Sequence, residues 1–345
     1  MATPGFRALR AGFPSARITL HLRESQLPLV AGSPWFDAVL PVRSYGARGL
    51  APLREGLALR AAHRFDLGLC LPDSFSSALL LRAAVRGTVI GYARDARSLL
   101  LDRAVPLPET QRGQRGGPWL PRELHVLGLV EAAGCAPLGT HVELFVTPEE
   151  DEEAERALAA AGVGAGDPIA ILAPGASFGT SKQWPPGHFA QAGDALASRA
   201  RIVIVGTPAE RALVASVAAE MREPAVDLAG RVGLGALKAV VRRARVAICN
   251  DAGLRHVAVA FGVPCVVLLG PTSLEKTALN LERVHVLVED VDCRPCYLRE
   301  CPIDHRCLVR IAPERAVEAA LPAFEGPGIG RSSGRGAPTA ARGAA

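Results

Sequence analysis

Short apolar runs of strand length recur along the chain, and a segment with helical spacing follows each of them. Parallel strands are buried on both faces, so they read as continuous apolar runs. Their alternation with helices predicts an α/β fold built from two doubly wound units with parallel sheets. The runs lie at residues 17–22, 38–42, 66–71 and 88–91 in the first half, and at 168–173, 201–205, 225–228, 246–249, 265–269 and 284–288 in the second.

Two segments carry helix-start signals. Thr147-Pro148-Glu149-Glu150 combines a capping residue, a proline at the first helical position and a glutamate three residues on, which predicts a capping box. Thr3 and Pro4 predict a helix at the start, with Phe6, Leu9 and Phe13 as its buried stripe. A doubly wound unit normally opens with a strand and a Gly-containing loop, so the first unit is predicted to lack its first strand.

The helix predicted after Thr147 ends near Gly162, and residues 162–167 form a natural hinge. We therefore expect a first domain at residues 1–162 and a second at residues 163–325. Residues 326–345 contain Gly, Ser, Arg, Pro and Ala with almost nothing to bury, and are predicted to be disordered.

Charge changes this picture in one respect. The 345 residues carry a net charge of only +5, which argues against a general nucleic-acid binder. Residues 1–145 hold 17 basic and 11 acidic side chains, so the first half is the candidate for an anionic partner. Glycines and prolines interrupt the longest uncharged stretch, so no transmembrane helix is predicted. Eight cysteines without a secretory signal indicate a reducing, cytoplasmic location.

The segment 173–184 follows a predicted strand of the second half and combines small residues, hydroxyls and one lysine, Lys182. Small residues let backbone N–H groups approach an anion, and Lys182 adds a positive charge. The spacing is not that of a Walker loop. The residues alone fit either a phosphate cradle or an ordinary Gly/Ser turn.

A second segment, Cys249-Asn250-Asp251-Ala252-Gly253-Leu254-Arg255-His256, also lies at a predicted strand end. Its donors would converge on one spot at a helix N-terminus, where a diphosphate is held without a metal. The alternative is that Asp251 only caps the helix and His256 is a packed core histidine.

Together these segments resemble a known family. The ordered motifs are Pro174-Gly175-Ala176-x-Phe178-Gly179-x-x-Lys182-x-Trp184-Pro185, Asn250-Asp251-x-Gly253-x-x-His256-x-Ala258 and Gly270-Pro271-Thr272-Ser273. In the first half, the segment 71–78 is similar to a Leu-Pro-Asn-Ser-Phe-x-Ser-Ala motif. The chain resembles the ADP-heptose:lipopolysaccharide heptosyltransferases, from Met1 to about Leu321, and is most like heptosyltransferase II.

The resemblance implies two Rossmann-like domains in the GT-B glycosyltransferase fold, the first binding acceptor and the second ADP-heptose. It implies transfer of heptose to the inner core (Kdo-lipid A) of lipopolysaccharide at the cytoplasmic face of the inner membrane, with no required cofactor. Family members usually have Ser or Thr where this chain has Ala252. The implied donor-binding residues are Ser177, Thr180, Ser181, Lys182, Glu210, Asp251, Gly253 and His256, and those on the acceptor side are Asp73 and Ser74.

The cysteines Cys293, Cys296, Cys301 and Cys307 form a separate cluster within 15 residues. Four soft ligands at this spacing could bind structural zinc, although the spacing is not that of paired zinc knuckles. A reduced structural loop without metal is the alternative. Similar cysteine runs occur in heptosyltransferase II-like sequences.

The family's reaction needs a carboxylate that takes the proton of the acceptor hydroxyl. In the family this base is an Asp after Gly in the loop that follows the first strand, and Met1-Ala2-Thr3-Pro4 resembles the residues just after that loop. We therefore expect the base to lie before Met1 in a longer gene product. The alternatives are a degenerate homologue that binds nucleotide sugar without transfer, and another GT-B transferase that uses a UDP or GDP sugar.

Overall fold

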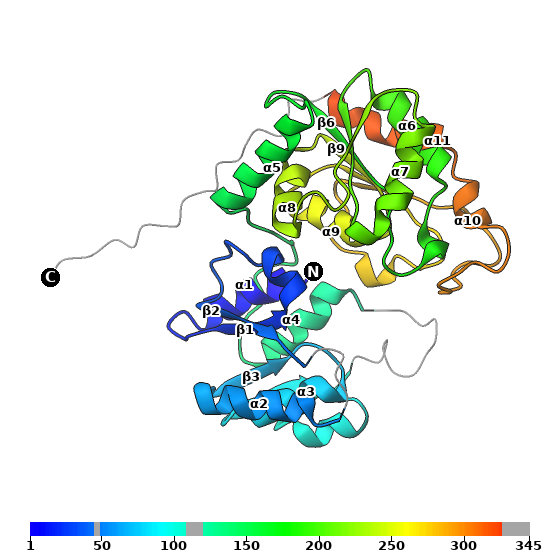
Figure 1. The fold of residues 1–345 in the computed structure, drawn as a ribbon. Coiled ribbons are helices and arrows are strands. Elements are labelled where there is room, and N and C mark those ends of the chain that lie inside the picture. The colour runs from blue at the N-terminus through cyan, green and yellow to red at the C-terminus, as the bar shows by residue number, and fades with distance from the viewer. Residues whose placement is uncertain (45–48, 108–119, 326–345) are drawn as a thin grey trace.

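The structure is a computed structural model that describes residues 1–44, 49–107 and 120–325. Figure 1 shows two units, the first drawn in blue and cyan and the second in green to red. Both are α/β with parallel sheets, which confirms the predicted fold class. The predicted disordered tail at residues 326–345 lies outside the described residues.

The second unit is built on one six-stranded parallel sheet in the order β11-β10-β9-β6-β7-β8. Every apolar run predicted for this half is confirmed as one of its strands, within one residue at each end. The strands are β6 (Ile169–Ala173), β7 (Arg201–Ile204), β8 (Ala225–Asp227), β9 (Val246–Asn250), β10 (Cys265–Leu268) and β11 (Val284–Leu287).

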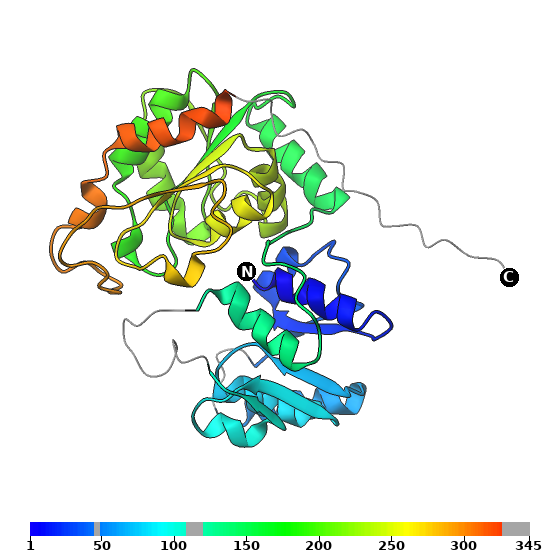
Figure 2. The ribbon, with the colours of Figure 1, turned by 180° about the vertical axis from the view of Figure 1, so that it is seen from behind.

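Helices cover both faces of this sheet (Figures 1 and 2). Alternate strand residues enter different apolar clusters: Leu172 and Ile248 pack on one face, and Ile171 and Ala247 on the other. The first face carries α6 (Pro186–Leu196), α7 (Arg211–Glu220) and α11 (Pro313–Ala320), with α10 (Arg306–Val309) beside them. The second face carries α5 (Pro148–Ala160), α8 (Leu234–Arg243) and α9 (Gly253–Ala260).

The first unit contains two shorter parallel sheets, β1-β2 and β3-β4-β5. The predicted runs are confirmed as β1 (Thr19–Arg23), β2 (Ala38–Val42), β3 (Leu67–Cys70) and β4 (Thr88–Tyr92); β5 (Arg103–Val105) was not predicted. Within the described residues no strand pairs with both sheets. The helices are α1 (Thr3–Gly12), α2 (Ala51–Ala62), α3 (Phe75–Ala84) and α4 (Arg122–Ala132).

Helix α5 has the predicted capping box. The Thr147 hydroxyl accepts from the Glu150 amide, and the Glu150 carboxylate accepts from the Thr147 amide at 3.0 Å. The predicted boundary at residue 162 placed this helix in the first domain, but its Ala154 and Leu158 belong to an apolar cluster of the second sheet. The structure therefore groups α5 with the second unit.

The predicted stripe of α1 is confirmed in part. Leu9 and Phe13 are partly buried and pack against an apolar cluster, whereas the fully buried residues of the helix are the small Thr3, Pro4, Gly5 and Ala8. These small residues let α1 approach α4, because a Cβ on Gly5 would lie 2.5 Å from a methyl of Val126. Phe6 turns elsewhere and makes an edge-to-face contact with Phe36, at 4.9 Å between ring centroids.

Candidate functional site

Three loops of the second unit meet at the carboxyl edge of its sheet. They are the Lys182 loop (residues 174–184) after β6, the short connection from β9 to α9, and the Thr272 loop (residues 269–277) after β10. The chain leaves β6 toward β7 on one side, while β9 pairs with β6 on the other. This is the switch point where doubly wound sheets bind their ligands.

Asp251 is the centre of this arrangement. The Lys182 ammonium donates to an Asp251 carboxylate oxygen at 2.7 Å, and both side chains are 12% exposed. The Thr272 hydroxyl donates to the same oxygen at 3.0 Å, and Arg255 to the other at 3.3 Å. Burial alone would raise the pKa of Asp251, but these partners hold it below its ordinary value. The carboxylate is therefore ionised and joins all three loops.

Asn250 fixes how the Lys182 loop leaves the sheet. This side chain is fully buried; its carbonyl accepts from the Trp184 amide at 3.0 Å, and its NH₂ donates to the Pro174 carbonyl at 2.7 Å. One amide thus binds both ends of the loop. The sequence motif contained Asn250, but no role was predicted for it.

The predicted donor residues of the Lys182 loop divide into two groups. Ser177 and Thr180 are exposed. Ser181 is 2% exposed, and its hydroxyl donates to the Leu298 carbonyl at 2.6 Å. Because Ser181 is committed to that contact, the structure gives it a role in holding the loop rather than the predicted contact with a diphosphate.

Glu210 lies at the end of β7 beside the Lys182 loop. Its carboxylate accepts from the Thr207 amide at 2.8 Å and from the Thr207 hydroxyl at 2.9 Å. A Cβ on Gly175 would come within 2.1 Å of the Glu210 carboxylate. The structure therefore brings the Glu210 carboxylate against the start of the Lys182 loop.

Helix α9 begins at Gly253, which is exposed. Asp251 does not cap this helix: the capping position is Ala252, which makes no side-chain cap hydrogen bond. The helix carries His256, and burial, followed by the charge of Arg255, lowers the pKa of His256 to about 4. His256 is therefore neutral at physiological pH.

Arg255 is a site residue that the sequence did not single out, although it lies inside the Asp251 motif. Its guanidinium is 1% exposed and donates to the Thr277 hydroxyl at 2.9 Å and the Thr277 carbonyl at 2.7 Å, besides its contact with Asp251. Arg255 thereby joins α9 to the Thr272 loop.

In the first unit, Ser74 caps α3 by accepting a hydrogen bond from the Ser77 amide at 3.2 Å. Asp73 lies 3.4 Å from an Arg97 nitrogen and 3.4 Å from His125 Nε2. Burial alone would raise the pKa of Asp73, but the nearby His125, followed by the charges of Arg122 and Arg97, lowers it. Arg97 and His125 are almost fully buried and were not predicted as site residues.

The two units meet near the start of α4, and the N-terminus lies between them in both views (Figures 1 and 2). Burial lowers the pKa of the Met1 amine, partly offset by the charge of Glu123. Burial raises the pKa of Glu123, which also feels the charge of Arg255 in the second unit. Charged groups of both units therefore face the same region.

The four cysteines of the predicted cluster differ in exposure. Cys293 and Cys296 are exposed, Cys301 is half-buried and Cys307 is buried. Burial raises the pKa of the Cys307 thiol, and the three other thiols raise it further. In the described part of the chain, no three His, Cys, Asp or Glu side chains are arranged to hold a metal ion. The zinc site stays a prediction.

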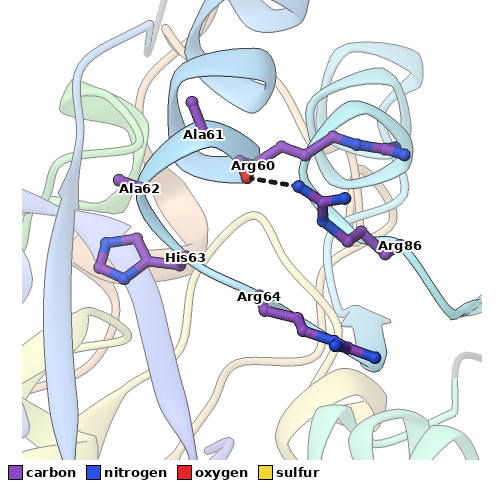
Figure 3. A pocket seen from close by; sticks show the side chains of 6 residues that line it. All are labelled: Arg60, Ala61, Ala62, His63, Arg64 and Arg86. Atoms are coloured by element: carbon purple, nitrogen blue, oxygen red, sulfur yellow. Dashed lines mark hydrogen bonds between the residues drawn. The ribbon is translucent and has the colours of Figure 1, made fainter.

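A separate basic hollow of about 580 Å³ lies on the first unit (Figure 3). Arg86 donates to the Arg60 carbonyl at 3.5 Å within it. Its residues precede β3 and β4, so it lies at the amino edge of that sheet and is separate from the three-loop site. The lining residues are Arg60, Ala61, Ala62, His63, Arg64 and Arg86.

Among the described residues, no helix has both the length and the apolar character needed to cross a bilayer. Two parallel α/β units and a cationic three-loop site at a sheet switch point are features of proteins that bind nucleotides or nucleotide sugars. The family model for glycosyltransferase family 9 (heptosyltransferase) matches residues 54–306. The chain belongs to this family of transferases.

Individual relatives agree with this assignment. Lipopolysaccharide heptosyltransferase 2 of Salmonella typhimurium is 26% identical over 343 residues, covering 91% of each chain. The solved structure of E. coli ADP-heptose lipopolysaccharide heptosyltransferase II is 23% identical with a TM-score of 0.76, covering 94% of each chain. A family 9 glycosyl transferase from Veillonella parvula is 20% identical with a TM-score of 0.79, covering 94% of this chain and 93% of that one. The two solved structures share the fold.

Proposed function

We propose that this chain binds ADP-heptose at the three-loop site and transfers the heptose, with inversion, to the inner core of lipopolysaccharide. The observation that carries the proposal is the Lys182–Asp251 pair, which joins two loops at the switch point of the second sheet. The name of the Salmonella relative, lipopolysaccharide heptosyltransferase 2, supports the choice of donor and acceptor.

The donor would lie along the carboxyl edge of the second sheet. Lys182 and the backbone at the start of α9 meet the diphosphate, with the exposed hydroxyls of Ser177 and Thr180 as further donors. Glu210, next to Gly175, accepts hydrogen bonds from the ribose hydroxyls. Neutral His256 can donate or accept a hydrogen bond beside the heptose without adding charge.

The acceptor would bind to the first unit, at Asp73 and Ser74. The ionised Asp73 carboxylate suits sugar hydroxyls, and the excess of basic side chains in residues 1–145 suits the polyanionic Kdo-lipid A core. Such an acceptor would place the protein peripherally at the cytoplasmic face of the inner membrane.

In the transfer, an acceptor hydroxyl oxygen forms a bond with the anomeric carbon as the bond from that carbon to the diphosphate oxygen breaks, and ADP leaves. Positive groups around the diphosphate stabilise the charge that grows on it. The hydroxyl proton passes to a base, and we assign no residue of the chain to that step.

The test is transfer itself. Purified chain, ADP-heptose and a lipopolysaccharide acceptor lacking the heptose should give an acceptor heavier by one heptose in the mass spectrum, with Lys182→Ala as the deficient control. Calorimetry with ADP, UDP and GDP on the same sample should show preference for ADP. Preference for UDP or GDP would overturn the donor assignment, and ADP binding without transfer would overturn transfer by this chain in favour of a homologue that binds nucleotide sugar without transferring it.

A further inference from the structure

We propose that the cysteine-rich loop (residues 288–305) sets the geometry of the donor pocket, and that Arg294 is its main positioning residue. The inference rests on the donor site proposed above. The loop lies between β11 and α10, outside the motifs assigned to the donor. It contacts both the Thr272 loop and the Lys182 loop.

The first contact is with the Thr272 loop. The Arg294 guanidinium donates to the Gly270 carbonyl at 2.7 Å and to the Thr272 carbonyl at 3.0 Å, and the Tyr297 amide donates to the Pro271 carbonyl at 2.9 Å. Three consecutive carbonyls are thus held just after β10 ends. A planar guanidinium fits this task because its donors have fixed directions.

This contact reaches the donor pocket in one further step. Thr272, whose carbonyl Arg294 holds, donates its hydroxyl to the Asp251 carboxylate at 3.0 Å. Asp251 in turn binds the Lys182 ammonium. A change in the path of the Thr272 loop would therefore alter the hydrogen bond from Thr272 to Asp251. Arg294 acts on the Lys182–Asp251 pair through this loop, since its own hydrogen bonds go to the Gly270 and Thr272 carbonyls.

The second contact is with the Lys182 loop. The Arg299 carbonyl accepts from the Ser181 amide at 3.1 Å, and the Leu298 carbonyl accepts from the Ser181 hydroxyl at 2.6 Å. The chains are so close that a Cβ on Gly179 would lie 2.2 Å from the Arg299 carbonyl oxygen. Lys182 directly follows Ser181 in the sequence. The cysteine-rich loop therefore supports both members of the Lys182–Asp251 pair.

The exposure of the cysteine-rich loop indicates that it supports the two donor loops and not the core of the second unit. Most side chains between residues 292 and 300 are exposed, whereas Arg294 is half-buried. The loop is therefore held in place largely by its hydrogen bonds to the two donor loops and adds little to the apolar core. Removing the Arg294 contacts should loosen the donor loops while leaving the sheet intact.

The experiment compares Arg294→Gln with Arg294→Lys and with Arg310→Gln, which removes an exposed arginine directly after α10. Arg294→Gln should weaken ADP binding about 10-fold by calorimetry, because two hydrogen bonds to carbonyls are lost. In the transfer assay the KM for ADP-heptose should rise more than kcat falls. The ADP affinity of Arg294→Lys should lie between those of the wild type and Arg294→Gln, because lysine keeps the charge but lacks the planar guanidinium. The ADP affinity of Arg310→Gln should match that of the wild type.

Amide hydrogen exchange without nucleotide separates this inference from the proposed function. Arg294→Gln should speed exchange in residues 177–184 and 270–277 while strands β6 and β9 and the melting temperature stay as in the wild type. Unchanged exchange in both loops, or a loss that spreads to the strands, would overturn the positioning role. Failure of the wild type to bind ADP would overturn the donor site instead, and the exchange result would still decide the role of Arg294.

Discussion

Both units alternate strands with helices, but their strands are buried to different extents. Strands β6 and β9 are buried at every position, and their side chains enter apolar clusters on both faces. Strands β1 and β2 are at best half-buried throughout. The sheet of the second unit therefore holds its loops more rigidly than the β1-β2 sheet of the first.

The chemistry of the two units differs in the same way. In the second, Asp251 and Lys182 extend from the ends of a continuous sheet, so packed strands set their positions. In the first, Asp73 depends on the buried polar side chains Arg97 and His125. The donor site therefore combines buried polar contacts with a continuous packed sheet, whereas Asp73 depends on a polar network beside a three-stranded sheet.

The largest effect should come from matched core truncations. Leu172 in β6 and Leu129 in α4 are both fully buried, but Leu172 lies in the larger cluster. Leu172→Ala should lower the free energy of unfolding by about 3–5 kcal/mol and Leu129→Ala by about 2–3 kcal/mol, because a small cluster collapses around a cavity more easily. Urea denaturation measures both. A larger loss for Leu129→Ala would reverse the comparison.

The polar network of the first unit predicts the next effect. Asp73→Asn leaves the Arg97 guanidinium buried without a carboxylate, so it should cost about 1–3 kcal/mol by urea denaturation at pH 7. Since its folded-state pKa is lowered, the contribution of Asp73 is present above its ordinary pKa and is lost as pH falls below it. The control is Asp66→Asn, because the Asp66–Arg64 pair is exposed. Equal losses of unfolding free energy in Asp73→Asn and Asp66→Asn would contradict a stabilising role for the polar network around Asp73.

The smallest effect is a pH dependence in the second unit. The pKa of His256 is about 4 in the folded chain, so the unfolded chain takes up the proton first as pH falls below 6.5. The free energy of unfolding should fall by about 1 kcal/mol more between pH 7 and pH 5 in the wild type than in His256→Gln, allowing for partial exposure. The control is His63→Gln, which changes an exposed histidine. Its free energy of unfolding should show the same pH dependence as that of the wild type. Parallel curves for the wild type and His256→Gln would contradict the lowered pKa of His256.

Sequence reasoning found the strands because parallel strands require apolar runs, and it found Lys182 and Asp251 because polar residues at strand ends are conspicuous. It missed the small buried residues of α1, since the close approach of α4 at Gly5 leaves no pattern in α1 itself. It also gave Ser181 to the ligand, because the carbonyl that Ser181 binds lies 117 residues away. Contacts between residues far apart in the sequence, such as those of Asp73 with Arg97 and His125, depend on the tertiary fold.

The donor site at the second sheet is the central claim, and calorimetric titration of ADP into the wild type and Lys182→Ala tests it most directly. The wild type should bind one ADP per chain, and Lys182→Ala should bind it about 10- to 100-fold more weakly, because a charged hydrogen bond is lost and Asp251 is left to repel the diphosphate. Arg242→Ala, which breaks only the surface pair with Asp151, should bind like the wild type. Equal affinities for the wild type and Lys182→Ala would contradict the account.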